Sequence, residues 1–65
     1  MNLKDRINSE IERLKSLRDS NKEEIQSAIN ELDFELATKL RKKTSLIDSK
    51  VRELLGLFYE LSKET

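Results

Sequence analysis

The second half of the chain carries a heptad stripe that continues without a slip from residue 37 to residue 61. Its members are apolar or small and recur at alternating spacings of three and four: Ala37, Leu40, Thr44, Ile47, Val51, Leu54, Phe58 and Leu61. This spacing keeps one side of a helix facing a partner helix along its whole length. No Pro interrupts it, and the single glycine, Gly56, falls on the outer face. The pattern predicts a helix over about residues 34–63 that must bury this stripe.

The first half of the chain shows the same periodicity. Spacings of three and four dominate among Leu3, Ile7, Ile11, Leu14, Leu17, Ile25, Ala28 and Ile29, which predicts a helix over about residues 2–30. Asn2 is a suitable N-cap for this helix. The segment Asp19-Ser20-Asn21 leaves two interpretations open. Either the helix continues through it, or Ser20 and Glu23 form a capping box that starts a new helix.

A short turn is expected at about residues 30–33, between the two helices. Asn30 tolerates the left-handed conformation that often ends a helix. Asp33 is a favourable N-cap for the helix that follows. Leu32 stands directly before that cap, so we expect it to pack on Ala37 as a hydrophobic staple.

Folding the chain at residues 32–33 tests whether the two stripes match. Residues whose numbers add up to about 65 then face each other: Ala28–Ala37, Ile25–Leu40, Asn21–Thr44, Arg18–Ile47, Leu14–Val51, Ile11–Leu54, Ile7–Phe58 and Lys4–Leu61. The two polar members, Asn21 and Thr44, meet in one layer, and such a layer can fix the register at some cost in stability. The match predicts an all-α fold, an antiparallel two-helix coiled-coil hairpin, as a single domain over residues 1–65.

Residues beside the stripes also face each other across the predicted hairpin. Lys15 comes near Asp48, which is a favourable pairing of opposite charges. Lys22 comes near Arg41, and these two like charges do not help the hairpin.

The small size of the chain indicates that it associates with another chain. A single core in a domain of 65 residues supplies roughly 3–5 kcal/mol. The chain has no Cys and no His, so a disulfide is excluded and a zinc site is not expected. Apolar residues outside the stripes offer a surface for association: Leu17, Leu46, Leu55, Leu57 and Tyr59. We expect a homodimer in which two hairpins form a four-helix bundle.

The sequence contains few side chains that are suited to catalysis, since it has no His and no Cys. No residue looks like an activated nucleophile beside a base, and one Gly cannot build a Gly-rich phosphate loop. Carboxylates such as Glu31 and Asp33 fit helix caps and solvated faces. We therefore expect no enzymatic activity, no cofactor and no metal ion. No apolar run approaches a membrane span and no signal-peptide core is visible, so we expect no membrane contact and a cytoplasmic setting.

A basic cluster in the second helix supports an alternative function, a small nucleic-acid-binding helical dimer. Its members are Lys39, Lys42, Lys43, Lys50 and Arg52. Against this alternative, the formal net charge of the chain is zero and aromatic residues for base stacking are few. We therefore favour a solvated helix face for this cluster.

The segment from Ala28 to Ile47 resembles the UVR motif. That motif occurs in proteins of the bacterial excision-repair complex, and in some stress-response Clp ATPases and their adaptor proteins. The matching residues are Ala28, Leu32, Asp33, Phe34, Glu35, Ala37, Leu40 and Arg41, with Ile47 as the later apolar residue. Thr38 departs from the motif, which usually has a second Ala there, and Lys42 replaces the usual acidic residue.

The resemblance implies a function as a protein–protein interaction module. In the UVR family the motif is a helical hairpin that mediates contact with another protein, including self-association. Carried over to this sequence, the partner-binding residues are Phe34, Leu36, Ala37, Leu40 and Arg41. Phe34 would be the apolar anchor and Arg41 the charged specificity contact. The expected function is therefore that of a non-catalytic adaptor or regulator that docks on itself or on a UVR-like partner.

A weaker resemblance leads to a further alternative. The segment Glu31-Leu32-Asp33 is similar to part of the motif of the small two-helix phosphatases of the sporulation regulator family. The Ser-Gln expected before it reads Ile29-Asn30. This resemblance would make the chain a small regulator of signalling by phosphorylation.

Overall fold

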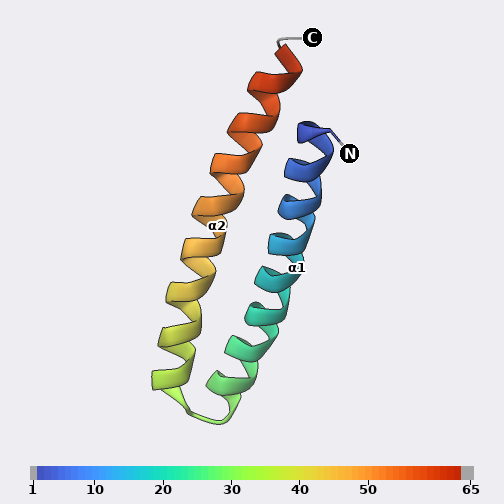
Figure 1. The fold of residues 1–65 in the computed structure, drawn as a ribbon. Helices are drawn as coiled ribbons and strands as arrows, with labels where there is room; N and C mark the ends of the chain where they lie inside the picture. The colour runs from blue at the N-terminus through green and yellow to red at the C-terminus, as the bar shows by residue number, and fades with distance from the viewer. Residues whose placement is uncertain (1, 64–65) are drawn as a thin grey trace.

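The computed structural model describes residues 2–63, which form two long α-helices that pack side by side. Helix α1 spans Leu3–Asn30 and helix α2 spans Phe34–Lys63. The chain reverses at a short turn, so the helices run antiparallel, and α2 extends beyond the start of α1 (Figure 1). The described residues contain no strand. The predicted all-α helical hairpin is confirmed; residues 1, 64 and 65 of the predicted domain lie outside the described part.

Helix α1 is continuous from its N-cap to its end. The Asn2 side-chain oxygen accepts a hydrogen bond from the Asp5 backbone N–H at 2.9 Å, which confirms the predicted cap. Asp19, Ser20 and Asn21 are all helical. The alternative in which Ser20 starts a second helix is therefore wrong, because the backbone hydrogen bonds continue through it.

The turn reverses the chain at Leu32, which has a positive φ of 62°. The Leu32 N–H donates to the carbonyl of Ile29 at 3.0 Å, and the Asp33 N–H donates to the carbonyl of Ala28 at 2.8 Å. This pair of bonds is the Schellman arrangement, in which the left-handed residue follows the helix C-cap. The left-handed residue is therefore Leu32 and not Asn30, because α1 continues through Asn30 and Glu31 is the C-cap.

Asp33 ends the turn and caps α2. Its side chain accepts from the Leu36 N–H at 3.2 Å, and its carbonyl accepts from the Ala37 N–H at 3.1 Å. The predicted N-cap is confirmed. The predicted staple is not formed: Ala37 is buried between the helices, whereas Leu32 is 73% exposed. A left-handed backbone at Leu32 directs its side chain away from the hairpin.

The predicted seam between the helices is confirmed along its whole length. Every residue of the eight facing pairs is buried or half-buried. The larger apolar cluster lies in the half away from the turn and contains Ile7, Ile11, Leu14, Val51, Ile47, Leu54, Leu55, Phe58 and Leu61. The half near the turn has a slimmer core around Ala28, Ala37 and Leu40.

A polar belt separates these two parts of the seam. Asn21 and Thr44 are both buried, which confirms the predicted polar layer. The Thr44 hydroxyl donates to the Leu40 carbonyl at 2.9 Å. Beside them, the Arg18 guanidinium reaches across to the Asp48 carboxylate at 3.4 Å. Asp48 thus pairs with Arg18 and not with Lys15, because Arg18 lies in the seam itself, one turn from the polar layer.

Candidate functional site

The turn end of the hairpin exposes a group of large apolar side chains. We call Ile29, Leu32 and Phe34 the turn-end cluster. Leu32 is 73% exposed and Phe34 is 61% exposed, and none of the three packs against the apolar core cluster. Exposed apolar residues that lie close together on a small protein mark interaction surfaces more often than isolated ones do. The turn end is therefore the first candidate site.

Leu32 is a member of this cluster that the sequence did not point to as a site residue. A left-handed backbone costs an L-amino acid roughly 1–2 kcal/mol, and Gly or Asn normally occupies such a position. Here the position holds a Leu whose side chain adds almost nothing to the hairpin. The signal in the sequence was a Leu directly before a helix N-cap with no glycine in the turn.

The structure divides the five predicted partner-binding residues into two groups. Phe34, Leu36 and Arg41 are exposed and accessible to a partner. Ala37 and Leu40 are only 5% and 6% exposed, because they lie in the seam opposite α1. Both hold the two helices together, so in the hairpin little of either side chain is open to a partner, and direct contact by them stays a prediction.

Four exposed leucines share one side of the hairpin, and we call them the leucine flank. Leu3, Leu17, Leu36 and Leu57 directly precede Lys4, Arg18, Ala37 and Phe58, the seam residues whose next seam neighbour is three positions on, and this places them beside the seam on one side of the hairpin. Leu46 precedes Ile47, whose next seam neighbour is four positions on, so Leu46 lies farther from the seam and is 72% exposed. Two of the predicted self-association residues, Leu17 and Leu57, belong to this flank.

The other predicted self-association residues lie elsewhere. Leu46 and Tyr59 are exposed on the outer side of α2. The Tyr59 ring meets that of Phe58 edge to face, with 6.5 Å between centroids. Leu55 is half-buried and packs against the core cluster, so only part of its surface remains for a second interface.

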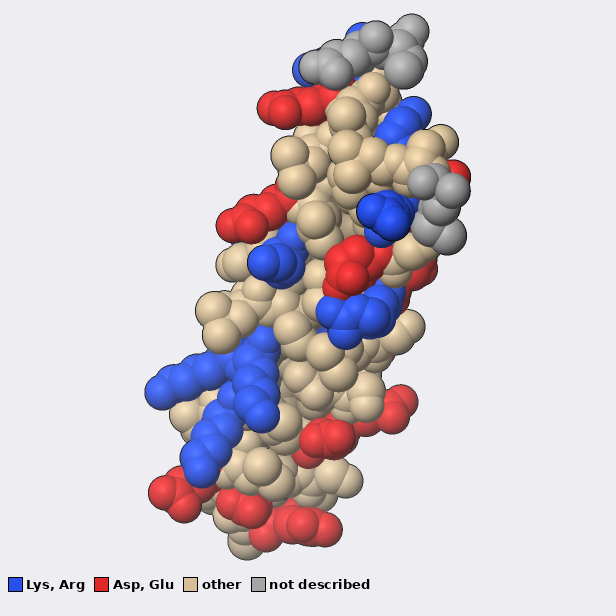
Figure 2. All heavy atoms as spheres, viewed as in Figure 1, with Lys and Arg blue, Asp and Glu red and all other residues tan. Residues whose placement is uncertain are grey.

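The predicted nucleic-acid residues are open to solvent, and basic side chains gather near the start of α2 (Figure 2). Lys39, Lys42, Lys43, Lys50 and Arg52 are all exposed on α2. Figure 2 shows basic side chains gathered over the first half of α2 and acidic ones around the turn below them. Acidic residues at the turn include Glu31, Asp33 and Glu35. They would repel a phosphate backbone that extended from the patch towards the turn.

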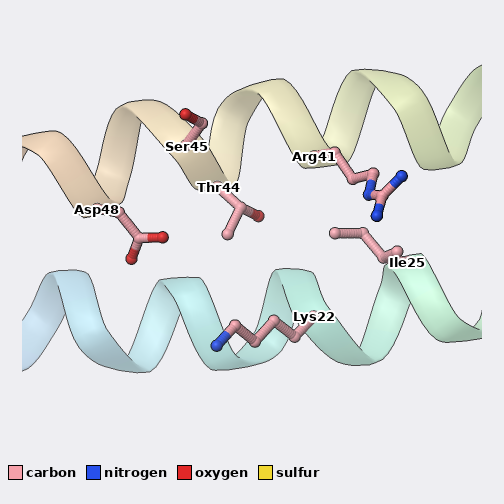
Figure 3. Close-up of a pocket in the computed structure, with 6 residues that line it drawn as sticks. All are labelled: Lys22, Ile25, Arg41, Thr44, Ser45 and Asp48. Carbon is pink, nitrogen blue, oxygen red and sulfur yellow. The ribbon is translucent and has the colours of Figure 1, made fainter.

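A groove of about 370 Å³ opens between the helices on the side opposite the leucine flank (Figure 3). It is lined by Lys22 and Ile25 from α1 and by Arg41, Thr44, Ser45 and Asp48 from α2. The predicted pair of like charges, Lys22 and Arg41, stands at this groove. The two side chains run in opposite directions, Lys22 towards Asp48 and Arg41 away from it, and Ile25 lies below Arg41 in the view.

Neither cation of the groove is neutralised within the described residues. No carboxylate pairs with Lys22 or Arg41, whereas Asp48 at the groove is already paired with Arg18. On the opposite flank, a hydrogen bond from the Arg13 guanidinium to the Glu10 carboxylate raises the pKa of Arg13. Arginine is charged at any ordinary pH, so that shift creates no pH switch.

Comparisons with protein-family models, with curated proteins and with solved structures found no match to this chain. Within residues 2–63, neither helix is long and apolar enough to cross a membrane.

Proposed function

We propose that this chain is a non-catalytic protein–protein interaction module that docks through the turn end of its helical hairpin. Its partner is a UVR-like hairpin or a second copy of the chain, and its function is that of an adaptor or regulator. The resemblance to the UVR motif supports this proposal, because the motif residues surround the turn. The proposal includes a cytoplasmic setting, which rests on the sequence alone.

The observation that carries the proposal is the placement of Leu32. Its backbone is left-handed and its side chain is 73% exposed, beside Phe34 at 61%. Folding of the hairpin alone would favour Gly at this position, and would favour polar side chains around it. A strained, exposed residue is explained when its side chain contributes to a contact outside the hairpin.

Self-association through the leucine flank is part of the same proposal. Burial of apolar flank area stabilises by roughly 25 cal/mol per Å², which would reinforce a hairpin with a small core. The two helices also differ in charge along this flank: Glu24 lies on α1, and Lys43 and Lys50 lie on α2. Two hairpins that place α1 of one against α2 of the other would bring opposite charges together in a four-helix bundle.

Replacement of Phe34 by Asp tests the turn end. The probe is an isolated UVR hairpin from a bacterial excision-repair protein, titrated against the chain, together with sedimentation equilibrium of the chain alone. Phe34→Asp should weaken binding at least roughly tenfold, since it removes an apolar anchor and adds a charge. Circular dichroism should show that helicity largely persists.

The matched control is Leu46→Asp, which places the same charge on an exposed leucine of α2 far from the turn. It should leave binding at the turn end unchanged. Equal binding by wild type and Phe34→Asp, both to the UVR hairpin and to a second copy, would show that the turn end is not the interface.

Nucleic-acid binding remains a second candidate function, because the basic patch of Figure 2 is exposed and unpaired in the described residues. Binding of this kind would weaken steeply with added salt. A titration with single-stranded and duplex DNA and RNA at low salt tests it, and the absence of any binding there would remove this candidate.

A further inference from the structure

The groove of Figure 3 combines two unusual features at one place. Lys22 and Arg41 occupy facing positions on the two helices, with their side chains directed apart, although opposite charges would stabilise the hairpin at such positions. Both cations line the open groove of about 370 Å³ between the helices. The fold gains nothing from this like-charge pair.

The same side of the hairpin continues into the turn-end cluster. Lys22 and Ile29 are seven residues apart on α1, and Arg41 and Phe34 are seven residues apart on α2. Seven residues are two helical turns, about 10.5 Å along the axis. Two cations therefore lie two turns above two exposed apolar side chains, with one of each kind on each helix.

We infer that this surface binds an acidic helical segment of a partner protein, with its carboxylates between Lys22 and Arg41 and its apolar residue on Phe34. A helix laid along the hairpin presents residues seven positions apart on one face at the same spacing of about 10.5 Å. The partner segment thus has an apolar residue at one position and Asp or Glu about seven positions away. This inference rests on the proposed function and specifies the chemistry of the partner.

The charges favour an acidic protein segment over a nucleic acid on this surface. Ile25 lies beside the cations in the groove, and the exposed Ile29 and Phe34 lie two turns further on, which suits the apolar face of a helix. The acidic residues at the turn, Glu31, Asp33 and Glu35, would meet a continuous phosphate backbone unfavourably. A helix with only one acidic turn keeps its carboxylates at the groove and away from these residues.

The structure also predicts a conflict between stability and binding at Lys22. Lys22→Glu would replace the like-charge pair by an ion pair with Arg41 across the helices. The hairpin should then melt at a higher temperature than wild type, while the acidic segment no longer binds. If Lys22 served only the fold, a substitution that raises the melting temperature would not also abolish binding of the acidic segment.

The test uses a fluorescent alanine-based helical peptide of about 16 residues. It carries an apolar pair near one end and a Glu pair two turns further on. Fluorescence anisotropy should show binding to the wild-type chain. Lys22→Gln and Arg41→Gln should each weaken it roughly tenfold, the loss expected for one charge-assisted contact. Arg52→Gln, a matched loss of charge outside the groove, should change it less than about twofold.

Further outcomes would overturn the inference. It fails if the peptide does not bind, if its Gln-for-Glu version binds equally well, or if Arg52→Gln is as damaging as Arg41→Gln. It also fails if an oligothymidine competes at the groove more strongly than the peptide. If Lys22→Gln disrupts only self-association in sedimentation, the occupant is a second copy of the chain.

These outcomes are distinct from failure of the proposed function. If Phe34→Asp abolishes binding to the UVR hairpin while the groove variants have no effect on any ligand, the turn end is an interface and the groove is not. If Phe34→Asp changes nothing, the proposed function itself is wrong.

Discussion

At the scale of single residues, the turn is built by two neighbours with different tasks. Asp33 serves both helices, since its N–H completes the end of α1 and its side chain caps the start of α2. Leu32 must then reverse the chain alone, with a positive φ that a leucine adopts at a cost. The hairpin therefore holds a strained residue at the point where it is most exposed.

Replacement of Leu32 by Gly should stabilise the isolated hairpin. Gly removes a left-handed strain of roughly 1–2 kcal/mol and costs roughly 0.5–1 kcal/mol through its greater freedom in the unfolded chain. The expected net gain is therefore about 0.5–1 kcal/mol in the free energy of unfolding, measured by urea denaturation followed by circular dichroism. Leu32→Ala keeps the strain and should show no such gain. A loss of stability in Leu32→Gly would mean that the leucine side chain supports the fold.

At the scale of the helices, most of the structure was predictable from the spacing of apolar residues. Periodicity placed α1, α2 and all the facing pairs, because burial of a stripe admits only one phase for each helix. The left-handed position was not predictable from residue preferences, because these favour Asn30 and the structure has Leu32 there. Periodicity also placed Ala37 and Leu40 in the seam, where both are buried.

The groove could not be predicted from the pattern. The sequence placed Lys22 near Arg41, and the opening between them depends on how neighbouring side chains fill space. Arg18 turns towards Asp48, and the side chains of Lys22 and Arg41 point apart. Such choices among side-chain conformations leave no trace in a heptad pattern.

Gly56 provides a prediction for helix α2. It lies in the helix with no positive φ, and an added Cβ would meet no atom within 4 Å. Gly56→Ala should raise the free energy of unfolding by about 1 kcal/mol through helix propensity alone. Urea denaturation measures the change, with Ser49→Ala on an exposed site of the same helix as the control for a change in propensity without glycine. A destabilised Gly56→Ala would indicate a close neighbour at this position in an assembled form.

At the scale of the whole molecule, the hairpin is long and thin. Its dimensions are 50 × 17 × 10 Å, and its radius of gyration is 15.0 Å, against about 11 Å for a compact domain of this length. It exposes 5249 Å², whereas a globular protein of 7.6 kDa exposes about 4,300 Å². No large side chain is fully buried in the described residues. A molecule of this shape gains stability when another chain covers part of it.

The melting temperature should therefore rise with protein concentration. Between about 2 and 200 μM, coupling of folding to self-association should raise it by roughly 10 °C. Leu17→Gln with Leu57→Gln on the leucine flank should remove most of this dependence, while Thr38→Gln, an exposed position on the other side of α2, should preserve it. A melting temperature that stays constant over this range would show that the leucine flank does not drive self-association.

The facing pairs of the seam also limit how such a hairpin can change in length. Insertion or deletion of one residue in either helix would rotate every residue beyond it out of the seam. Insertion of one heptad into each helix, at equal distances from the turn, would instead leave each facing pair intact. Each matched pair of heptads would move the turn end by about 10.5 Å. The hairpin can therefore change its length only in steps of one heptad per helix. Each step would move the turn end nearer or farther without a change in the residues that the turn end exposes.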